Sequence, residues 1–478
     1  MNQPLTELPV VVIGAGPVGL AAAAHLADRN IDFLLLESGD EVAAAIRQWG
    51  HVRLFSPWRY NIDATAQVLL EKTAWTAPDL DANPTGADLV EEYLAPLAAT
   101  PQIAPRLRLG HKVTAISRVG VDRVRSRSRE YAPFLLRVTA AGQTTDVHAR
   151  AIIDASGTWS APNVLGASGL PAHGEADAAA YIDHALPDVL GTARAIYAGK
   201  HTLVIGAGYS AVNTLLSLAE LAQQERGTHV TWAIRTGSAA RSFGGGAADA
   251  LPARGALGSR LRALVAEGRV ELLNQFSTER IRILPGGSVE VESVDARGVS
   301  KIVSADRIVA ATGFRPDHSI ASELRLDLDP ILGATRTLAP LIDPNEHSCG
   351  TVPPHGVDEL THPEPNYFAV GAKSYGRAPT FLMATGYEQA RSVVAALDGD
   401  WDAARDLRLE LPETGVCSAS LPGEEGEAGG CCGASQPSQS SQPEPQAVQV
   451  GFATGVSGGL LSEPLPIVTT GSGSGCCS

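Results

Sequence analysis

Cysteine is scarce through most of this 478-residue sequence, and no two cysteines are spaced as a Cys-x-x-Cys redox pair. Of the six cysteines, only Cys349 precedes residue 410. The other five come later, as Cys417, Cys431, Cys432, Cys476 and Cys477. This spacing argues against thiol chemistry that needs an internal disulfide, and we expect no disulfide framework.

Positive charge is also in short supply, with 37 Lys and Arg against 52 Asp and Glu and a net charge of -15. Such a balance argues against nucleic acid or an anionic membrane as a general partner. One local exception is the alternation Arg123, Arg125, Arg127 and Arg129. It predicts one solvated side of a β-hairpin.

A basic leader is missing before the apolar run of residues 10–26, and that run contains a glycine motif. We therefore expect neither a signal peptide nor a membrane span, and a cytoplasmic location. The content of 44% hydrophobic and 19% charged residues is typical of a globular protein. The length implies two or three domains.

The glycine motif follows the apolar, strand-like run 9–13 and consists of Gly14, Gly16 and Gly19, spaced G-x-G-x-x-G. The first glycine allows a tight strand-to-helix turn, the second lets backbone N–H groups approach a pyrophosphate, and the third allows close packing of helix on strand. The pyrophosphate then lies at a helix N-terminus, which favours an anion. This motif predicts a dinucleotide site.

A second copy follows the run 201–205, where Gly206 and Gly208 are followed by Ser210 and by Ala211 in the third role. Each copy stands between a β-branched strand and a helix rich in Ala and Leu. The alternative for each copy is a tight turn that binds nothing. Two dinucleotide sites on one chain are the better explanation.

The two copies differ in the residue that ends the following strand. Glu37 ends the strand after the first copy, where a carboxylate can accept hydrogen bonds from both ribose hydroxyls of FAD or NAD. Arg235 holds the equivalent place after the second copy and can pair with the 2′-phosphate of NADP.

Two later strand signals end in small residues, one at Ser156 and Gly157 and the other at Thr312 and Gly313. Glycine at such a place lets backbone pass close to something bulky. The pair is best explained as the crossings between two nested domains. A third strand signal ends at Gly371 and feeds a helix N-terminus, which suits an electron-rich ligand edge.

These signals predict an α/β fold with two nested Rossmann-like, three-layer dinucleotide-binding domains. The first domain is discontinuous, over residues 1–195 and 305–405, and the second covers 196–304. A small antiparallel β excursion is expected near residues 112–149. Residues 406–478, rich in Gly, Ser, Pro, Gln and Glu, are predicted to form a disordered tail.

The two motifs, with the crossings at 154–157 and 311–313, resemble flavoproteins with two dinucleotide-binding domains, especially the flavin-containing monooxygenase-like branch. The resemblance covers about residues 9–400. It implies FAD on the first copy, NADPH on the second, and electron flow from nicotinamide to flavin. No metal site is implied.

The sequence departs from this branch in two places. The signature F-x-G-x-x-x-H-x-x-x-Y/W is absent before the second copy, so the resemblance supports flavin binding more strongly than oxygen chemistry. Many relatives place Asp directly after the glycine of the last strand, whereas here Ala372 follows Gly371 and Lys373 comes next. A cation there could stabilise the anionic reduced flavin. The alternative is a solvent-facing lysine.

The segment 49–58 resembles the loop that flanks the flavin in this branch. Three aromatic residues and an arginine in so short a loop suggest contact with the ring. The residues expected near the flavin ring are Trp49, Arg53, Trp58, Lys373 and Tyr375.

The leading hypothesis is a monooxygenase that uses FAD, oxidises NADPH and acts on a small molecule with a soft nucleophilic S, N or trivalent As atom. The alternative is a reductase that passes electrons to a thiol, quinone or protein. The chain also resembles flavoproteins associated with arsenic resistance, so a third hypothesis is metalloid binding by the tail thiols Cys431, Cys432, Cys476 and Cys477. The sequence does not predict the oligomeric state.

Overall fold

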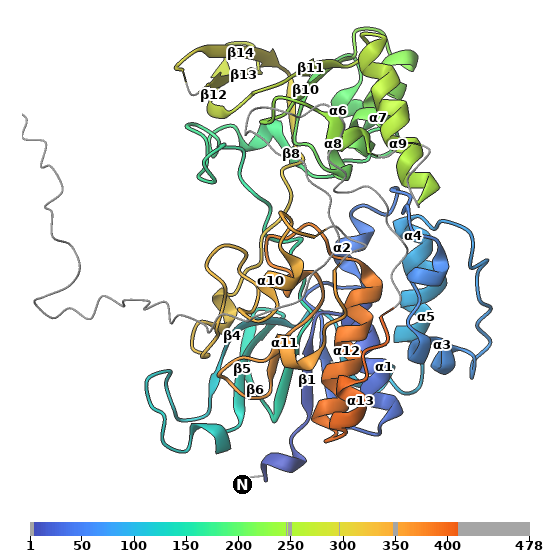
Figure 1. Cartoon of the computed structure of the whole chain (residues 1–478), viewed down its shortest axis with the longest axis vertical. Coiled ribbons are helices and arrows are strands. Elements are labelled where there is room, and N and C mark those ends of the chain that lie inside the picture. Colours follow the sequence, from blue (N-terminus) through green and yellow to red (C-terminus); the bar gives the residue numbers. More distant parts are fainter. Residues whose placement is uncertain (1–3, 245, 247–250, 296, 348–351, 410–478) are drawn as a thin grey trace, which may run out of the picture. The chain divides into compact units, whose positions relative to one another are not determined.

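A parallel five-stranded sheet, visible in the lower half of the computed structural model (Figure 1), forms around the first glycine motif. The model describes residues 4–244, 246, 251–295, 297–347 and 352–409. The strand order is β16-β7-β1-β2-β3. The strands are β1 (Val10–Ile13), β2 (Phe33–Leu36), β3 (Leu107–Arg108), β7 (Ala151–Asp154) and β16 (Tyr367–Ala369). Because β16 joins β7, this sheet combines segments that are far apart in sequence.

Both faces of this sheet are covered, which explains why its strands are apolar at successive positions. Val10 and Val12 face helices α1 (Pro17–Asp28) and α12 (Met383–Leu397), which pack against each other. Val11 and Ile13 face the antiparallel sheet of β4 (Lys112–Arg118), β5 (Phe134–Ala140) and β6 (Gln143–Ala149). The three layers and the antiparallel excursion are confirmed.

The second glycine motif lies in a second parallel sheet with the order β11-β10-β9-β15-β8. Its strands are β8 (Ile182–His184), β9 (His201–Ile205), β10 (His229–Ala233), β11 (Glu271–Leu273) and β15 (Arg307–Ala310). Helices α7 (Tyr209–Gln224) and α9 (Pro252–Ala266) cover one face. An antiparallel sheet covers the other, made of β12 (Thr278–Leu284), β13 (Ser288–Val294) and β14 (Ser300–Ala305). The three-layer plan therefore occurs twice.

Shorter elements connect these layers. The remaining α-helices are α2 (Ala44–Arg47), α3 (Ala64–Leu70), α4 (Gly86–Asp88), α5 (Ala95–Ala98), α6 (Arg194–Tyr197), α8 (Ala240–Phe243), α10 (Ala339–Ile342), α11 (Val357–Leu360) and α13 (Trp401–Arg405). The 3₁₀ and π turns are η1 (Leu5–Glu7), η2 (Trp58–Tyr60), η3 (Leu89–Leu94), η4 (Ala104–Arg106), η5 (Arg129–Tyr131), η6 (Ala179–Tyr181), η8 (Ser319–Ala321) and η9 (Gly371–Lys373). Within the described ranges, no helix has the length and apolarity needed to cross a membrane.

The two predicted crossings run side by side and are tied together by one amide side chain. Asn163 donates through Nδ2 to the carbonyl of Thr312 at 3.0 Å, and its Oδ1 accepts from Arg315 Nε at 2.9 Å. The Thr312 hydroxyl donates back to the Asn163 carbonyl at 2.8 Å. Trp159 stacks on Phe314 with 4.8 Å between ring centroids. The passages between the two sheets thus form one paired ribbon.

Most of the predicted tail lies outside the described residues, as do all six cysteines. The prediction assigned residues 406–409 to the tail, but hydrogen bonds connect this segment to α12. Arg391 donates to the Asp406 carbonyl at 2.7 Å, and Arg408 N–H donates to Glu388 at 2.8 Å. The domain boundaries stay predictions.

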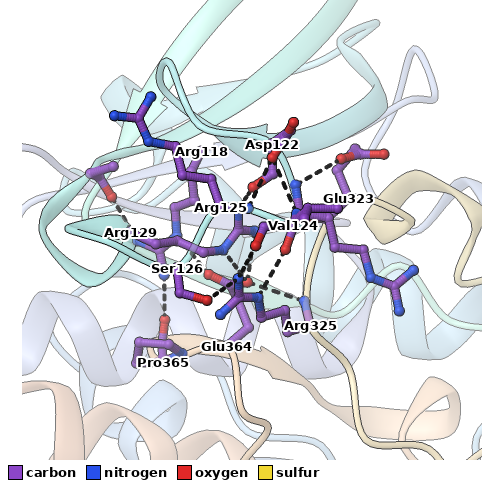
Figure 2. Close-up of polar contacts among 12 residues, drawn as sticks. Arg118, Asp122, Val124, Arg125, Ser126, Arg129, Glu323, Arg325, Glu364 and Pro365 are labelled. Atoms are coloured by element: carbon purple, nitrogen blue, oxygen red, sulfur yellow. Dashed lines mark hydrogen bonds and ion pairs between the residues drawn. The ribbon is translucent and has the colours of Figure 1, made fainter.

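The expectation that the arginines of residues 123–129 form one solvated side of a β-hairpin is wrong. The segment is a loop, and Arg129 at its end is 3% exposed. Figure 2 shows Arg118 and Arg129 converging on the carboxylate of Glu364, with N···O distances of 2.8 Å for each pair. The guanidinium of Arg118 also lies 3.5 Å from the centre of the Phe134 ring. One buried carboxylate therefore ties this loop and β4 to the segment that leads into β16.

Glu364→Gln should destabilise the fold because it leaves two guanidinium groups buried without their counter-charge. Removing one partner of a buried pair costs about 3–5 kcal/mol. The matched control is Glu290→Gln, whose partner Arg282 is largely exposed, and for which at most about 1 kcal/mol is expected. Urea midpoints and melting temperatures of the two variants measure the difference. Equal small losses would contradict the role of Glu364.

The contacts of Glu364 with Arg118 and Arg129 also predict that the stability of the fold depends on pH. Burial alone would raise the pKa of Glu364, but hydrogen bonds from Arg129, the Arg325 N–H and Arg118 hold that pKa below its usual value of 4.5. A carboxylate with a lowered folded pKa stabilises above its unfolded pKa, and that stabilisation is lost as pH falls through the folded value. Wild type should therefore lose stability below about pH 4.5 more steeply than Glu364→Gln.

Candidate functional site

The first glycine motif forms a turn in which each glycine has a separate steric reason. Gly14 has φ +96°, and a Cβ on it would lie 2.7 Å from the carbonyl oxygen of Ala155. A Cβ on Gly19 would lie 1.8 Å from the Gly14 carbonyl oxygen. A Cβ on Gly16 would meet nothing within 4 Å. The first and third glycines are needed for packing, and the second borders open space.

The second motif repeats this geometry. Gly206 has φ +139°, and its Cβ would lie 2.1 Å from the Ala311 carbonyl oxygen. A Cβ on Gly208 would again meet nothing within 4 Å. Ala211, in the third role, is fully buried, and Ser210 lies in the first turn of α7. Both turns therefore have a cradle that suits a pyrophosphate.

The helices that start at these turns have no side-chain caps. Gly16 is the N-cap of α1 and Gly208 is the N-cap of α7, and neither can supply a side-chain acceptor. Backbone N–H groups of a first helical turn then remain for a ligand, and the helix dipole favours an anion there. Both helix starts fit a dinucleotide pyrophosphate.

Glu37 lies against the first turn. Its carboxylate accepts from the Ala15 N–H at 2.7 Å and from the Gly39 N–H at 2.8 Å, and the residue is 8% exposed. The Ser38 hydroxyl also donates to it, at 3.3 Å. A carboxylate has about four acceptor positions, so one hydroxyl donor can still be bound, and a second if it replaces Ser38. Its position fits the expected contact with a ribose.

Arg235 follows β10 at the second turn and is exposed. One guanidinium nitrogen donates to the Ala167 carbonyl at 3.2 Å. Among the described residues, no carboxylate lies within ion-pair distance of it, so its other N–H groups remain for a phosphate. Arg241, in α8, is also exposed.

Gly157, Gly313 and Gly371 occupy the ends of the returning strands with φ values of +68°, +83° and +71°. The Gly371 N–H donates to Gln389 Oε1 at 2.8 Å, and Gln389 in turn bonds to the fully buried His355. Burial lowers the pKa of His355, which keeps this imidazole neutral. The turn after β16 is thus fixed from within α12.

Lys373 is buried, which excludes the alternative of a solvent-facing lysine. Its ammonium lies 2.7 Å from Asp154 Oδ2 and 3.1 Å from Ser156 Oγ, and the residue is 1% exposed. Burial alone would raise the pKa of Asp154, but the charge and hydrogen bond of Lys373, with hydrogen bonds from Ser156, hold it below its usual range. Sequence analysis missed Asp154, although a charged residue at the end of an apolar strand is a signal.

Three of the other residues expected near the flavin ring, Trp49, Trp58 and Tyr375, lie in or against one hydrophobic cluster. Trp58 and Tyr375 are 3% and 1% exposed and belong to the hydrophobic core. Trp49 packs against Gly86, and exposed Arg53 donates to the Asn83 carbonyl. Their roles toward a flavin stay predictions.

The loop does line a cavity, but through other residues. The cavity has a volume of ≈ 170 Å³, and no acidic or basic side chain is among the described residues that line it. They are mostly apolar and comprise Leu54, Phe55, Ser56, Tyr60, Asn61, Leu251, Phe381, Leu382, Met383 and Ala384. The last three form the start of α12, whose N-cap Leu382 supplies no capping hydrogen bond. This arrangement fits the predicted electron-rich ligand edge.

Gly16→Ala should weaken FAD binding without disturbing the fold, because its Cβ enters the open space of the first cradle. We expect the Kd for FAD to rise at least about tenfold, or about 1.4 kcal/mol, with an unchanged melting temperature of the apoprotein. Gly19→Ala should instead lower that melting temperature, because its Cβ meets the Gly14 carbonyl. Fluorescence titration and thermal melts separate the two. Unchanged FAD affinity in Gly16→Ala would place the pyrophosphate elsewhere.

Arg235→Ala should reduce the preference for NADPH over NADH, measured as the ratio of kcat/KM values. A lost charge-assisted contact costs about 1.5–3 kcal/mol, or roughly 10- to 150-fold. Arg226→Ala is the matched control, since Arg226 is an exposed arginine before the opposite end of the same strand. An unchanged ratio in Arg235→Ala would exclude the 2′-phosphate contact.

Known proteins resemble this chain over most of its length. It is 26% identical over 323 residues to a ferredoxin–NADP reductase of Gluconacetobacter diazotrophicus, covering 66% of this chain and 75% of that protein. Among solved structures, it matches the bacillithiol disulfide reductase of Bacillus cereus with a TM-score of 0.61 and 19% identity, over 82% of this chain and 99% of that chain.

A second solved structure is the FAD-bound cadaverine monooxygenase of desferrioxamine biosynthesis from Erwinia amylovora, with a TM-score of 0.59 and 12% identity over 86% of this chain and 97% of that chain. These likenesses confirm the predicted fold class. The sequence profile of the pyridine nucleotide-disulphide oxidoreductases matches residues 11–349. The expectations of an oxidoreductase and of FAD and NADPH as cofactors are confirmed. With two such cradles and a profile match over most of its length, the chain belongs to the pyridine nucleotide-disulphide oxidoreductase family.

Proposed function

We propose that this oxidoreductase is a monooxygenase that oxidises NADPH and acts on a small, uncharged molecule with a soft nucleophilic atom. The observation that carries the proposal is the apolar cavity at the start of α12, which has no charged side chain among its described lining residues. FAD, held by the first glycine turn and Glu37, would supply two-electron transfer from NADPH to O₂, with one oxygen atom entering the substrate and the other leaving as water.

The size of the cavity limits the substrate. A volume of ≈ 170 Å³ is smaller than the roughly 300–1,000 Å³ of pockets that hold drug-sized ligands. A substrate with few heavy atoms fits this space. The absence of an ionised partner favours an uncharged one, because a charge without a partner is costly in an apolar site.

The residues around the cavity supply exclusion of water and orientation. Leu54, Phe55 and Phe381 present apolar surface to the cavity. Apolar surface excludes water, which limits side reactions during oxygen transfer. The uncapped start of α12 offers backbone N–H groups to an electron-rich edge. Tyr209, in the second motif, contacts Phe55 with 5.3 Å between ring centroids. No side chain in this arrangement needs to act as acid, base or nucleophile.

Soft atoms that fit such a site are the sulfur of a thioether, the nitrogen of a neutral amine and the arsenic of an uncharged trivalent hydroxide. The resemblance to flavoproteins associated with arsenic resistance supports including arsenic. The tail thiols Cys431, Cys432, Cys476 and Cys477 lie outside the described residues, and we propose that they bind the same thiophilic metalloid.

A second candidate function is a reductase that passes electrons to a thiol, quinone or protein acceptor. The sequence similarity to ferredoxin–NADP reductases favours it. Residues 1–409 contain a single cysteine, Cys349, so a relay through an internal disulfide in this region is excluded by composition. A reductase of this kind would pass electrons directly from the flavin.

The experiment follows NADPH oxidation and O₂ uptake by the FAD-loaded full-length chain with sulfur, nitrogen and trivalent arsenic compounds. We expect one of these compound classes to stimulate both rates. Its product should contain oxygen derived from isotopically labelled O₂. Stimulation by ferredoxin or a quinone alone, with no label in any product, would instead establish the reductase.

A variant pair tests the cavity in the same assay. Ala384→Phe should reduce the stimulation by substrate at least about tenfold, because the larger side chain fills the cavity. NADPH should still reduce the flavin in this variant. Ala64→Phe, an exposed alanine at the start of α3, is the matched control. A chain ended after Leu409 tests the tail: an unchanged response to trivalent arsenic would exclude a role of the tail thiols. Equal activity of Ala384→Phe and wild type would exclude the cavity as the substrate site.

A further inference from the structure

Asp154 and Lys373 form an ion pair that is closed off from solvent. Asp154 ends β7 and is 0% exposed, while Lys373 ends η9 and is 1% exposed. The ammonium lies 2.7 Å from Asp154 Oδ2. Taking both charges out of water is costly, and an apolar pair of similar volume is often as stable. Stability alone therefore does not explain why charges occupy this position.

Two hydroxyl groups also bond to the carboxylate. Ser156 donates through Oγ to Asp154 Oδ1 at 2.6 Å and accepts from Lys373 at 3.1 Å. Tyr367 donates through its hydroxyl to Asp154 Oδ2 at 2.9 Å. Hydrogen bonds to the charged form of a carboxylate favour that form. These hydrogen bonds hold both charged groups in fixed positions.

The pair lies in the wall of the first cradle. The Cβ that Gly14 lacks would stand 3.1 Å from the Cα of Ser156, the residue that bonds to both charges. The Cβ that Gly371 lacks would stand 3.2 Å from Val18, in the first turn of α1. Lys373 follows Gly371 by two residues. The two charges are thus built into the turns that border the FAD site.

Other ionisable groups nearby do not add net charge to the wall. Burial and the ammonium of Lys373 lower the pKa of His318, so that imidazole is neutral at pH 7. Asp317 is exposed to solvent, which screens its charge. The buried charged groups of the described cradle are therefore the Asp154–Lys373 pair and the carboxylate of Glu37, which bonds to the Ala15 N–H.

We propose that the two charges of this pair shift the reduction potential of the bound flavin in opposite directions. Reduction adds negative charge to the flavin, which the ammonium of Lys373 favours and the carboxylate of Asp154 opposes. Removing either charge alone therefore shifts the potential. The proposal rests on FAD binding alone and not on the monooxygenase assignment, so either can fail without the other.

The test is a spectroelectrochemical titration of the FAD-loaded protein at pH 8. Asp154→Asn leaves an uncompensated ammonium and should raise the midpoint potential. Lys373→Met removes the ammonium that favours reduction, and should lower it. The double variant should return close to wild type. Shifts of opposite sign are the signature of charge, because a purely structural defect has no reason to change sign.

Two controls separate charge from structure. Tyr367→Phe removes one hydrogen bond from Asp154 without changing charge, and should leave the potential nearly unchanged. Glu364→Gln disrupts a buried ion pair that precedes β16, away from the Gly371 turn, and should also leave it unchanged. Shifts of the same sign in both single variants, or no shift in Lys373→Met, would overturn the proposal. If Asp154→Asn does not retain FAD, Lys373→Met alone decides it.

Discussion

The fold depends on one steric constraint that occurs twice: a glycine turn packed against the end of a returning strand. Gly14 lies against Ala155 and Gly206 against Ala311, at separations that no Cβ would tolerate. Each contact joins the strand before a glycine motif to the strand beside it, β1 to β7 and β9 to β15, and directs a helix N-terminus into open space. The cradles exist because these backbones approach so closely.

The sequence was informative where a local pattern has only one structural use. The spacing of Gly14, Gly16 and Gly19 predicted the turn, the helix and the bordering strand, and Glu37 and Arg235 were placed correctly at the ends of the next strands. It was less informative where a long-range partner decides. Arg129 lies in an alternation typical of a solvated strand, yet it is buried because Glu364, far away in sequence, meets it. A single sequence contains no signal of this long-range contact.

The second antiparallel sheet was missed although its alternation is visible, as in Val289 and Val291 between polar neighbours. The loop of residues 49–58 was singled out for its three aromatic side chains, but two of them, Trp49 and Trp58, pack inward. The cavity is lined by the less conspicuous Leu54 and Phe55. Aromatic content predicted where chain segments gather and not which side chains face the space. That distinction depends on packing, which periodicity does not determine over an irregular loop.

The pairing of β16 with β7 has a consequence for how the chain acquires its fold during synthesis. Residues 151–154 find their partner only when residues 367–369 have emerged, whereas every strand of the second parallel sheet lies between residues 182 and 310. Domains generally fold as units, in order of their emergence from the ribosome. Here the interior unit can close first, while the sheet that surrounds it in sequence waits with one edge unpaired. An exposed edge strand is an aggregation hazard, so the interval between these two stretches is the period in which the nascent chain most needs protection.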